Sequence, residues 1–251
     1  HNFDPSNAAT NDGWMTDGVG SYIADGRSVV KEDNRYMVCE IMDEGMLTQA
    51  VAAGGIITLA GDIDLGQTIE ITKDVTINLN GHYVKCQPSD VFKVTSGTLT
   101  LNGEGTVWGS ESNTGNSCAI WVNGADAKAI INGGTYKVGG DINSDDKRND
   151  CIYVGSEGGT IEIYDGEFQY TGDVASGDEG TNKDGNRFLV NQKDSHTEQL
   201  ITIYGGVFHN FDPSNAATND GWMTDGKDSY VASGYSSSTS DNGATYQVTK
   251  D

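Results

Sequence analysis

The middle of the chain alternates apolar and polar residues with a period of two, which is typical of β-strands. The clearest form is Ile-x-Ile-x-x-Gly-x-aromatic, which occurs at residues 161–168 and again at 201–208. The same positions are filled by Ala129, Ile131, Gly134 and Tyr136, and looser versions span residues 99–107 and 77–83. We therefore predict pairs of strands that turn at a glycine and end on an inward-facing aromatic residue.

A shorter strand precedes each of the later alternations. Its form is apolar-x-Val, and the four examples are Phe92-Lys93-Val94, Ile120-Trp121-Val122, Ile152-Tyr153-Val154 and Phe188-Leu189-Val190. The first and third positions are always apolar, so they are expected to face inward. The middle position varies widely and is expected to face outward.

Three strands and their turns thus form one coil, which cannot bury its inner face alone. Parallel coils stacked about 4.8 Å apart would pair the backbone groups and close a continuous apolar column. Over residues 55–210 this pattern resembles the right-handed parallel β-helix, the pectate-lyase-like superfold, which implies an all-β solenoid. A β-sandwich is the rival fold, although its strands do not usually come in matched triplets with a fixed Gly-x-aromatic ending.

Residues 42–53 are predicted to form a short helix. Met46, Leu47, Ala50 and Val51 share one face of it, and Gly54-Gly55 end it. An open coil end exposes unpaired strand edges. A helix placed just before the first coil would cover that end, so we predict that it is an N-terminal cap.

The two ends of the chain repeat each other. Residues 1–18 and 209–226 are identical, and the copies stay alignable through Tyr36-Met37-Val38 and Tyr246-Gln247-Val248. Such a repeat indicates a tandem array. We divide the chain into 1–41, the loop-plus-hairpin tail of a preceding unit; 42–54, the capping helix; 55–208, the β-helix; and 209–251, a second tail. An artefact of how the sequence was assembled is the alternative.

The composition excludes several partners. There are 37 acidic residues against 15 Lys and Arg, a formal net charge of −22, which disfavours binding to nucleic acid or to an anionic membrane. No apolar run approaches the length of a membrane span, so we predict no membrane insertion. The chain begins at His1 rather than Met, so we expect a processed product or a piece of something longer.

Cysteine usage does not indicate a disulfide scaffold or a zinc site. Cys39, Cys86, Cys118 and Cys151 are scattered and form no CxxC pair. One bridge stays open as an alternative, but buried free thiols are the favoured interpretation.

Insertions gather at one corner of successive coils, at residues 109–117, 139–150 and 172–186. They are rich in carboxylates, so we expect neighbouring acidic loops that are either merely solvated or a binding face. Asp141-x-Asn143-x-Asp145 begins like an EF-hand but lacks the later Gly and Glu. A looser Ca²⁺ site remains a hypothesis, with Asp141, Asp145, Asp178 and Asp184 as candidate ligands; no other cofactor is expected.

Outward aromatic residues also align. Trp121 and Tyr153 hold the middle position of successive short strands, and Tyr164 and Tyr204 align on another strand. Exposed rings could stack on a sugar or on another protein, so these four are the candidate ligand-binding residues. A cross-strand ladder that stiffens the sheet is the favoured alternative.

No catalytic residues are assigned. The chain lacks G-x-S-x-G, H-E-x-x-H, P-loop and dinucleotide patterns. Polysaccharide cleavage is the serious enzymatic alternative, since many β-helix proteins do it. Its carboxylates would be Asp145/Asp146 and Asp178/Glu179, and its only cations near a coil with acidic neighbours are Arg187 and Lys193. The Gly-His-Gly and Arg-Ile-Lys tripeptides of pectin hydrolases do not occur.

The tail motifs add a second resemblance. They are Asn210-Phe211-Asp212-Pro213-Ser214-Asn215, Ser229-Tyr230-Val231-Ala232 and Gly243 through Val248. Together with the predicted coils they resemble repeat units of virion-surface proteins of phages and prophages, and of some bacterial surface adhesins. The resemblance implies a non-enzymatic structural or adhesive module at the virion or cell surface. Expected partners are neighbouring repeat units or a homo-oligomer, and a cell-surface glycan; the alternative is a polysaccharide lyase or hydrolase.

Overall fold

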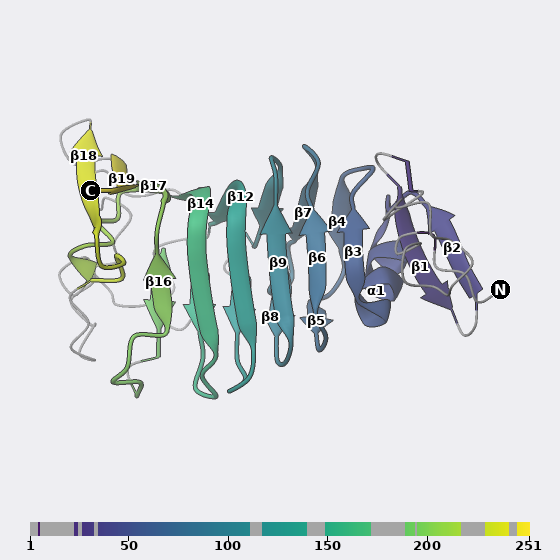
Figure 1. Cartoon of the computed structure of the whole chain (residues 1–251), viewed down its shortest axis with the longest axis horizontal. Coiled ribbons are helices and arrows are strands. Elements are labelled where there is room, and N and C mark those ends of the chain that lie inside the picture. Colours follow the sequence, from purple (N-terminus) through teal and green to yellow (C-terminus); the bar gives the residue numbers. More distant parts are fainter. Residues whose placement is uncertain are drawn as a thin grey trace, which may run out of the picture.

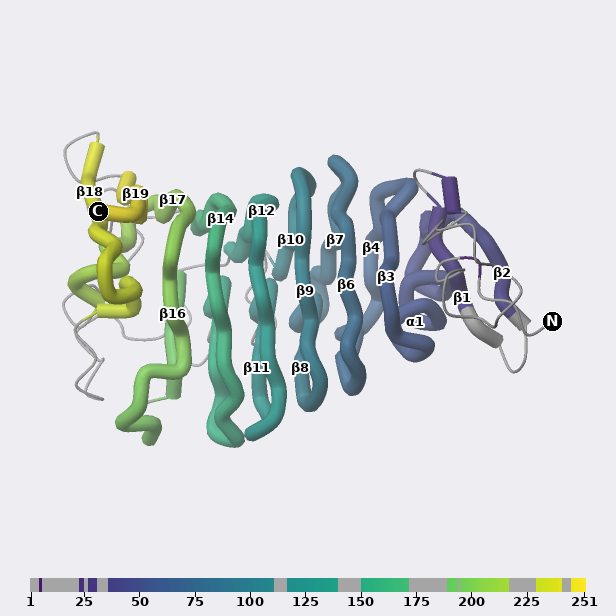
Figure 2. The backbone as a smooth tube through the Cα atoms, in the orientation of Figure 1, coloured from purple at the N-terminus to yellow at the C-terminus, as the bar shows by residue number. Residues whose placement is uncertain are grey.

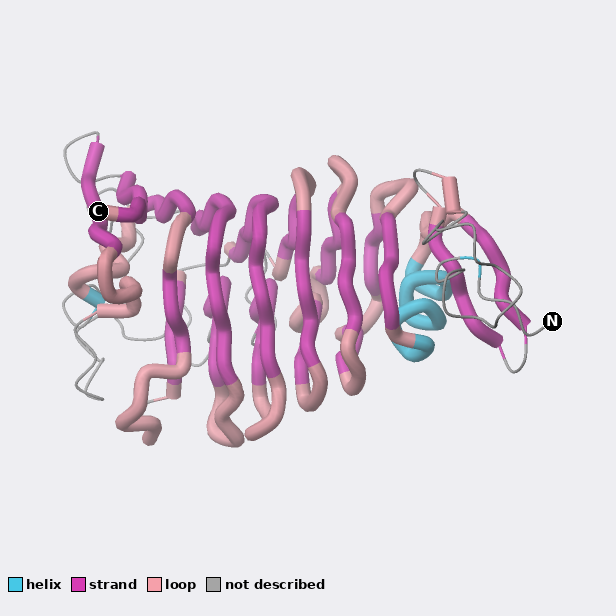
Figure 3. The backbone as a smooth tube through the Cα atoms, viewed as in Figure 1, coloured by secondary structure: helices cyan, strands magenta, loops and turns pink. Residues whose placement is uncertain are grey.

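The computed structural model describes most of the chain as a long stack of short strands (Figure 1). The described residues are 5, 23–24, 27–32, 35–110, 117–139, 149–171, 189–193, 195–216, 229–240 and 245–251. Figure 2 shows the first and last strands, β1 and β19, at opposite ends of the longest axis. The molecule is mostly β, as the alternating pattern predicts, with a helix beside the first strands of the stack (Figure 3).

The parallel strands form three ladders, which we number for reference. The first ladder contains β3 (Gly55–Thr58), β6 (Val75–Asn78), β9 (Thr98–Asn102), β12 (Lys128–Val138), β14 (Thr160–Tyr170) and β16 (Ile201–Ile203). The second contains β4 (Ile63–Leu65), β7 (Tyr83–Cys86), β10 (Thr106–Trp108), the ends of β12 and β14, and β17 (Gly206–His209). The third contains β5 (Ile69–Ile71), β8 (Phe92–Val94), β11 (Ser117–Val122), β13 (Asn149–Val154) and β15 (Val190–Gln192).

The chain visits the ladders in a fixed order, so each circuit adds one strand to each ladder. Strands β8, β9 and β10 make one circuit, and β11 with the long strand β12 makes the next. Among the described residues, antiparallel pairing is confined to two hairpins and to the contact of β17 with the second hairpin. The parallel ladders therefore do not match the β-sandwich alternative.

One short strand lies two residues later than the sequence pattern predicts. Val190, not Phe188, pairs with Ile152, so Gln192 takes the inward position that Val154 holds one circuit earlier. The Gln192 side chain is fully buried. Its amide nitrogen donates to the backbone oxygens of His196 and Glu198, and its Oε1 accepts from the Leu200 amide. These bonds explain how an amide replaces an apolar residue in the core.

The pattern also underestimates the third ladder, because Ile69-Glu70-Ile71 forms β5 and pairs in register with β8. Both isoleucines are buried and Glu70 is exposed, as in the later members of the ladder.

Stacked aromatic rings run through the second ladder inside the molecule. Tyr136 stacks on Phe168 with ring centroids 5.0 Å apart, and Phe168 stacks on Phe208 at 4.8 Å. All three side chains are fully buried, and they are the aromatic residues that end the sequence motif. The Tyr136 hydroxyl is satisfied because it donates to the Gly133 carbonyl at 2.8 Å.

The predicted helix is present as α1 (Glu44–Ala53) and lies beside β3 at the first circuit (Figure 3). Asp43 caps its start by accepting from the Met46 amide at 2.8 Å. At its end the Lys73 ammonium donates to the Ala52 carbonyl at 2.7 Å. Leu47, Ala50 and Val51 are buried as predicted, whereas Met46 is exposed.

An antiparallel hairpin stands at each end of the stack. The N-terminal hairpin pairs β1 (Ser28–Glu32) with β2 (Arg35–Cys39), and the C-terminal one pairs β18 (Tyr235–Ser240) with β19 (Thr245–Lys250). Strand β19 also pairs antiparallel with β17, so it covers the exposed edge of the second ladder.

The cysteines are present as free thiols. All four cysteines are free; Cys86, Cys118 and Cys151 are buried and Cys39 is half-buried. Within the described residues, no helix combines the length and the apolar character that a membrane-spanning segment needs.

The aromatic stack yields a stability prediction. Phe168 has a ring on each side, so Phe168→Ala should lower the free energy of unfolding by about 3–5 kcal/mol. Urea unfolding followed by circular dichroism measures this loss. The control is Ile56→Ala, since Ile56 is 64% exposed and its truncation should cost under about 1 kcal/mol. Equal losses for the two variants would contradict the stack's importance.

Candidate functional site

The third ladder holds one pair of the predicted ligand-binding residues. Trp121 on β11 pairs in register with Tyr153 on β13, and on its other side with Lys93 on β8. The Lys93 ammonium lies 4.5 Å from the centroid of the Trp121 ring, within cation–π range. Both aromatic side chains are half-buried. The Trp121 ring is thus already held by its own ladder neighbours.

The Trp121 indole also depends on a glycine one circuit away. A Cβ atom added to Gly155 would lie 2.5 Å from the indole nitrogen and 2.4 Å from Asn123 Oδ1. The Asn123 Oδ1 in turn accepts from the Glu157 amide at 3.0 Å. Gly155 therefore leaves the space in which the indole ring and the turn after β13 fit together.

The second predicted pair lies on another sheet. Tyr164 on β14 stacks on Tyr204, with ring centroids 4.7 Å apart and planes 6° from parallel. Tyr235 of the C-terminal hairpin meets Tyr204 edge-on at 5.5 Å. The Tyr164 hydroxyl donates to Glu162 Oε2 at 3.1 Å. The pKa of Tyr164 is raised, first by partial burial and second by this hydrogen bond to Glu162. Tyr164 is 45% exposed, so solvent still reaches part of its side chain.

The four predicted aromatic residues therefore form two separate pairs rather than one site. Sequence alignment of the coils placed Trp121 beside Tyr153 and Tyr164 beside Tyr204 correctly. It could not place the two pairs relative to each other, because they belong to different sheets.

A third outward cluster was not among the sequence candidates. Trp108 at the end of β10 pairs with Lys85 on one side and with Lys137 on the other. The two ammonium groups lie 3.6 Å and 5.6 Å from the ring centroid. A signal was present in the sequence, because each of the three residues directly follows the inward residue of its second-ladder strand.

Asn78 and Asn102, two members of an asparagine ladder, line an open hollow of about 450 Å³ at the turn between the first and second ladders. The side-chain NH₂ of Asn102 donates to Asn78 Oδ1 at 3.1 Å, and the side-chain NH₂ of Asn132 donates to Asn102 Oδ1 at 2.9 Å. Successive asparagines so satisfy one another. The hollow offers polar groups, but the side-chain NH₂ groups of Asn78, Asn80 and Asn102 already donate to Thr58 Oγ1, to the Leu59 carbonyl and to Asn78 Oδ1, respectively.

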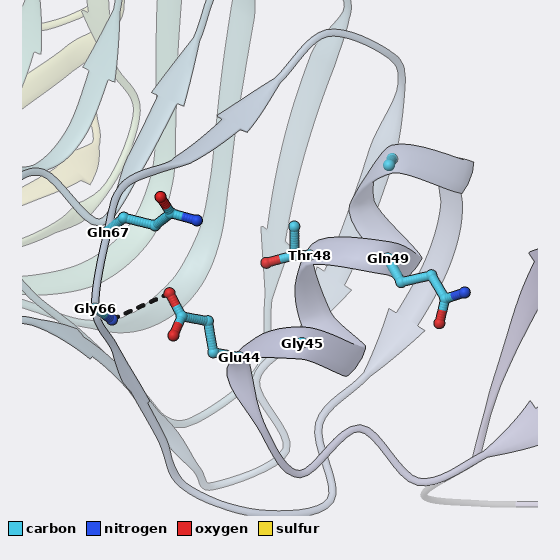
Figure 4. A pocket seen from close by; sticks show the side chains of 7 residues that line it. Glu44, Gly45, Thr48, Gln49, Gly66 and Gln67 are labelled. Atoms are coloured by element: carbon cyan, nitrogen blue, oxygen red, sulfur yellow. Dashed lines mark hydrogen bonds between the residues drawn. The ribbon is translucent and has the colours of Figure 1, made fainter.

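A larger and more open hollow of about 790 Å³ separates α1 from the turn between β4 and β5. Glu44 and Thr48 project into it from the helix, and Gly66 and Gln67 lie opposite (Figure 4). The Glu44 carboxylate accepts from the Gly66 amide at 3.1 Å. This bond ties the helix to the first circuit, so the hollow is a structural junction.

Acidic residues are buried beneath the corner where the insertions leave the stack. Asp90 and Asp150 lie on either side of Cys118 in the third ladder, and all three are buried. The Cys118 amide donates to Asp90 Oδ1 at 2.7 Å. Burial raises the pKa of the Asp90 carboxyl, although the Cys118 amide and thiol and the Lys93 charge oppose the rise. Burial also raises the pKa of Cys118 well above its usual value.

This finding corrects one expectation about the insertions. Asp150 belongs to β13 and is 1% exposed, so it is not a surface loop carboxylate. Ser110 and Ser117 are likewise buried. The Ser117 hydroxyl donates to the Ser89 carbonyl and accepts from the Ser110 amide, which closes the base of the first insertion.

The predicted Ca²⁺ ligands Asp141, Asp145, Asp178 and Asp184 lie outside the described residues, as do Asp146, Glu179 and Arg187 of the enzymatic alternative. Within the described ranges, no three His, Cys, Asp or Glu side chains are grouped to hold a metal ion. Comparisons with protein-family models, curated proteins and solved structures found no match to this chain.

Substitution of Gly155 tests the packing around Trp121. Gly155→Ala places a methyl group against the indole nitrogen and Asn123, so we expect a loss of about 1–3 kcal/mol in unfolding free energy. Chemical denaturation gives the value. The matched control is Gly45→Ala, where the new Cβ has an ordinary 3.4 Å contact and should raise stability by up to about 1 kcal/mol. A neutral Gly155→Ala would contradict the close approach.

The Asp90 carboxyl predicts a pH effect. Because its pKa is raised in the folded state, its neutral form stabilises the fold at low pH, and this contribution is lost as the pH rises through that pKa. Asp90→Asn keeps an oxygen for the Cys118 amide and removes the charge. The variant should be more stable than the parent near pH 7, and the gain should vanish below the ordinary value of 3.8.

Urea midpoints of parent and variant at several pH values measure this difference. Asp126→Asn, which alters an exposed carboxylate, is the control and should show no such pH-dependent gain. A loss of stability in Asp90→Asn near pH 7 would contradict a desolvated carboxyl.

Proposed function

We propose that the chain is a right-handed parallel β-helix unit that serves as a non-enzymatic structural or adhesive module. In this proposal it is one unit of a tandem array in a phage fibre, another virion-surface protein or a bacterial surface protein. It would be exposed outside the cell or on the virion. The observation that carries the proposal is that one stack of parallel strands has the same hairpin at both ends, with identical flanking sequence.

The order of the ladders supports the solenoid part of this proposal. Each circuit passes through the third, first and second ladders and returns one strand further along. Such a stack transmits its geometry from one circuit to the next, since each circuit contacts only its neighbours. An elongated, self-supporting body of this kind suits a spacer or fibre segment.

The outward side chains support a structural role over a ligand site. The Tyr164 and Tyr204 rings cover each other, and Trp121 and Trp108 each carry a lysine over the ring. Asn78, Asn102 and Asn132 bond to one another. These side chains are used to hold neighbouring circuits together. Contact with a glycan would use the surface that they leave exposed, above all the exposed part of Tyr164.

Net charge supports a solvated location. A formal charge of −22 makes copies of the chain repel one another in solution and favours the binding of cations or of positively charged partners.

Surface labelling tests the proposal. Antibodies raised against the purified chain should label the outside of intact cells or virions of the source, as seen by immunogold electron microscopy. Labelling confined to lysed cells would overturn the surface assignment.

A glycan panel tests the non-enzymatic part. The purified chain should release neither reducing ends nor unsaturated uronates from capsular and uronate-containing polysaccharides. Release that disappears in Asp145→Ala/Asp146→Ala would instead support a polysaccharide lyase or hydrolase.

A further inference from the structure

The two hairpins are equivalent residue by residue. Val29 pairs with Val38 in the first hairpin, and the corresponding Ser237 pairs with Val248 in the second. All five cross-strand residue pairs of the first hairpin have such a counterpart in the second. The second hairpin differs by two extra residues between its strands. The repeat in sequence is therefore also a repeat in structure.

The C-terminal hairpin shows what its inner face binds. Strand β19 pairs with β17, with Val248 opposite Gly206 and Tyr246 opposite Phe208. Val248 is only 3% exposed and Ala232, just before the hairpin, is 8% exposed. The Ala232 amide donates to the Ile203 carbonyl at 2.9 Å. The last circuit of the stack thus covers one face and one edge of this hairpin.

The N-terminal hairpin presents the same groups without that cover. Val38, the counterpart of Val248, is 48% exposed, and Ala24, the counterpart of Ala232, is also exposed. In the described part of the chain β2 pairs with β1 alone. Val38 and Ala24 are therefore exposed where the last circuit covers their counterparts at the other end, and among the described strands β2 lacks the second neighbour that β17 gives to β19.

The opposite face of the N-terminal hairpin is covered by the circuit that follows it. Ser28 and Val30 are buried. The Ser28 hydroxyl donates to the Thr58 carbonyl at 3.0 Å and accepts from the Thr58 amide at 2.6 Å. Their counterparts Ser236 and Ser238 are exposed. The C-terminal hairpin thus packs one face against the circuit before it, and the N-terminal hairpin packs the opposite face against the circuit after it.

We propose that the face of the N-terminal hairpin that carries Val38, together with strand β2, binds the last circuit of a preceding copy of this unit. The proposal rests on the tandem-array function and names its contact. A strand equivalent to Gly206–His209 pairs antiparallel with β2, and Val38 packs where Val248 packs. One face of the hairpin then packs against the preceding stack and the other face against the following stack. Consecutive units are therefore joined by a fixed junction rather than by a flexible linker.

A two-unit chain tests this contact. Residues 1–208 are joined directly to residues 1–251, so the seam keeps the natural sequence of 209–226. Hydrogen exchange is followed by mass spectrometry at Arg35–Cys39 of the second copy and in the 251-residue chain. We expect exchange at least about tenfold slower in the two-unit chain, approaching that of β19.

Substitutions separate docking from folding. Val38→Asp should abolish the added protection in the two-unit chain and leave the melting temperature of the 251-residue chain almost unchanged. Ile56→Asp, at another exposed apolar position, should leave the protection intact. Small-angle scattering of the two-unit chain should give one extended rigid body.

Two results would overturn the proposal. One is equal exchange of β2 in both chains. The other is protection in the 251-residue chain that rises with protein concentration, because a free second copy would then be the occupant. Either result leaves surface labelling as an independent test of the proposed function.

Discussion

Parallel pairing in register places each residue directly beside its counterpart one circuit away, and the rest of the structure depends on this constraint. Tyr136, Phe168 and Phe208 stack because they hold one position in three circuits. Asn78, Asn102 and Asn132 hydrogen bond for the same reason. A side chain in such a ladder must tolerate its own kind on both sides, which favours flat rings, branched aliphatics and amides.

Charged residues cannot satisfy that constraint by repetition, since like charges in adjacent strands repel. The chain avoids such columns where it is described. Glu70 stands beside Lys93, and Trp108 separates Lys85 from Lys137. Lys128 bridges diagonally to Glu162 at 2.9 Å. The excess negative charge is therefore compatible with the ladders because outward columns mix opposite charges with aromatic residues.

The all-β class, most strands of the later circuits and the helix follow from the sequence, because alternation with a period of two and the glycines that end the helix are local signals. The pairing of Trp121 with Tyr153 followed from aligning the coils. The two-residue shift at Val190 did not, because it depends on hydrogen bonds that the buried Gln192 side chain donates to the His196 and Glu198 carbonyls and accepts from the Leu200 amide. The sequence also did not indicate that Asp90 and Asp150 are buried, since acidic residues beside polar insertions are usually exposed to solvent.

The separation of the stack from its two ends has an evolutionary consequence. The first and last circuits meet the helix and the hairpins, whereas a circuit in the middle meets only other circuits. Gain or loss of one whole middle circuit would preserve every terminal contact and change the length by about 4.8 Å. Replication slippage within the gene could thus change the length of the stack in steps of one circuit, while the contacts at both ends stay the same.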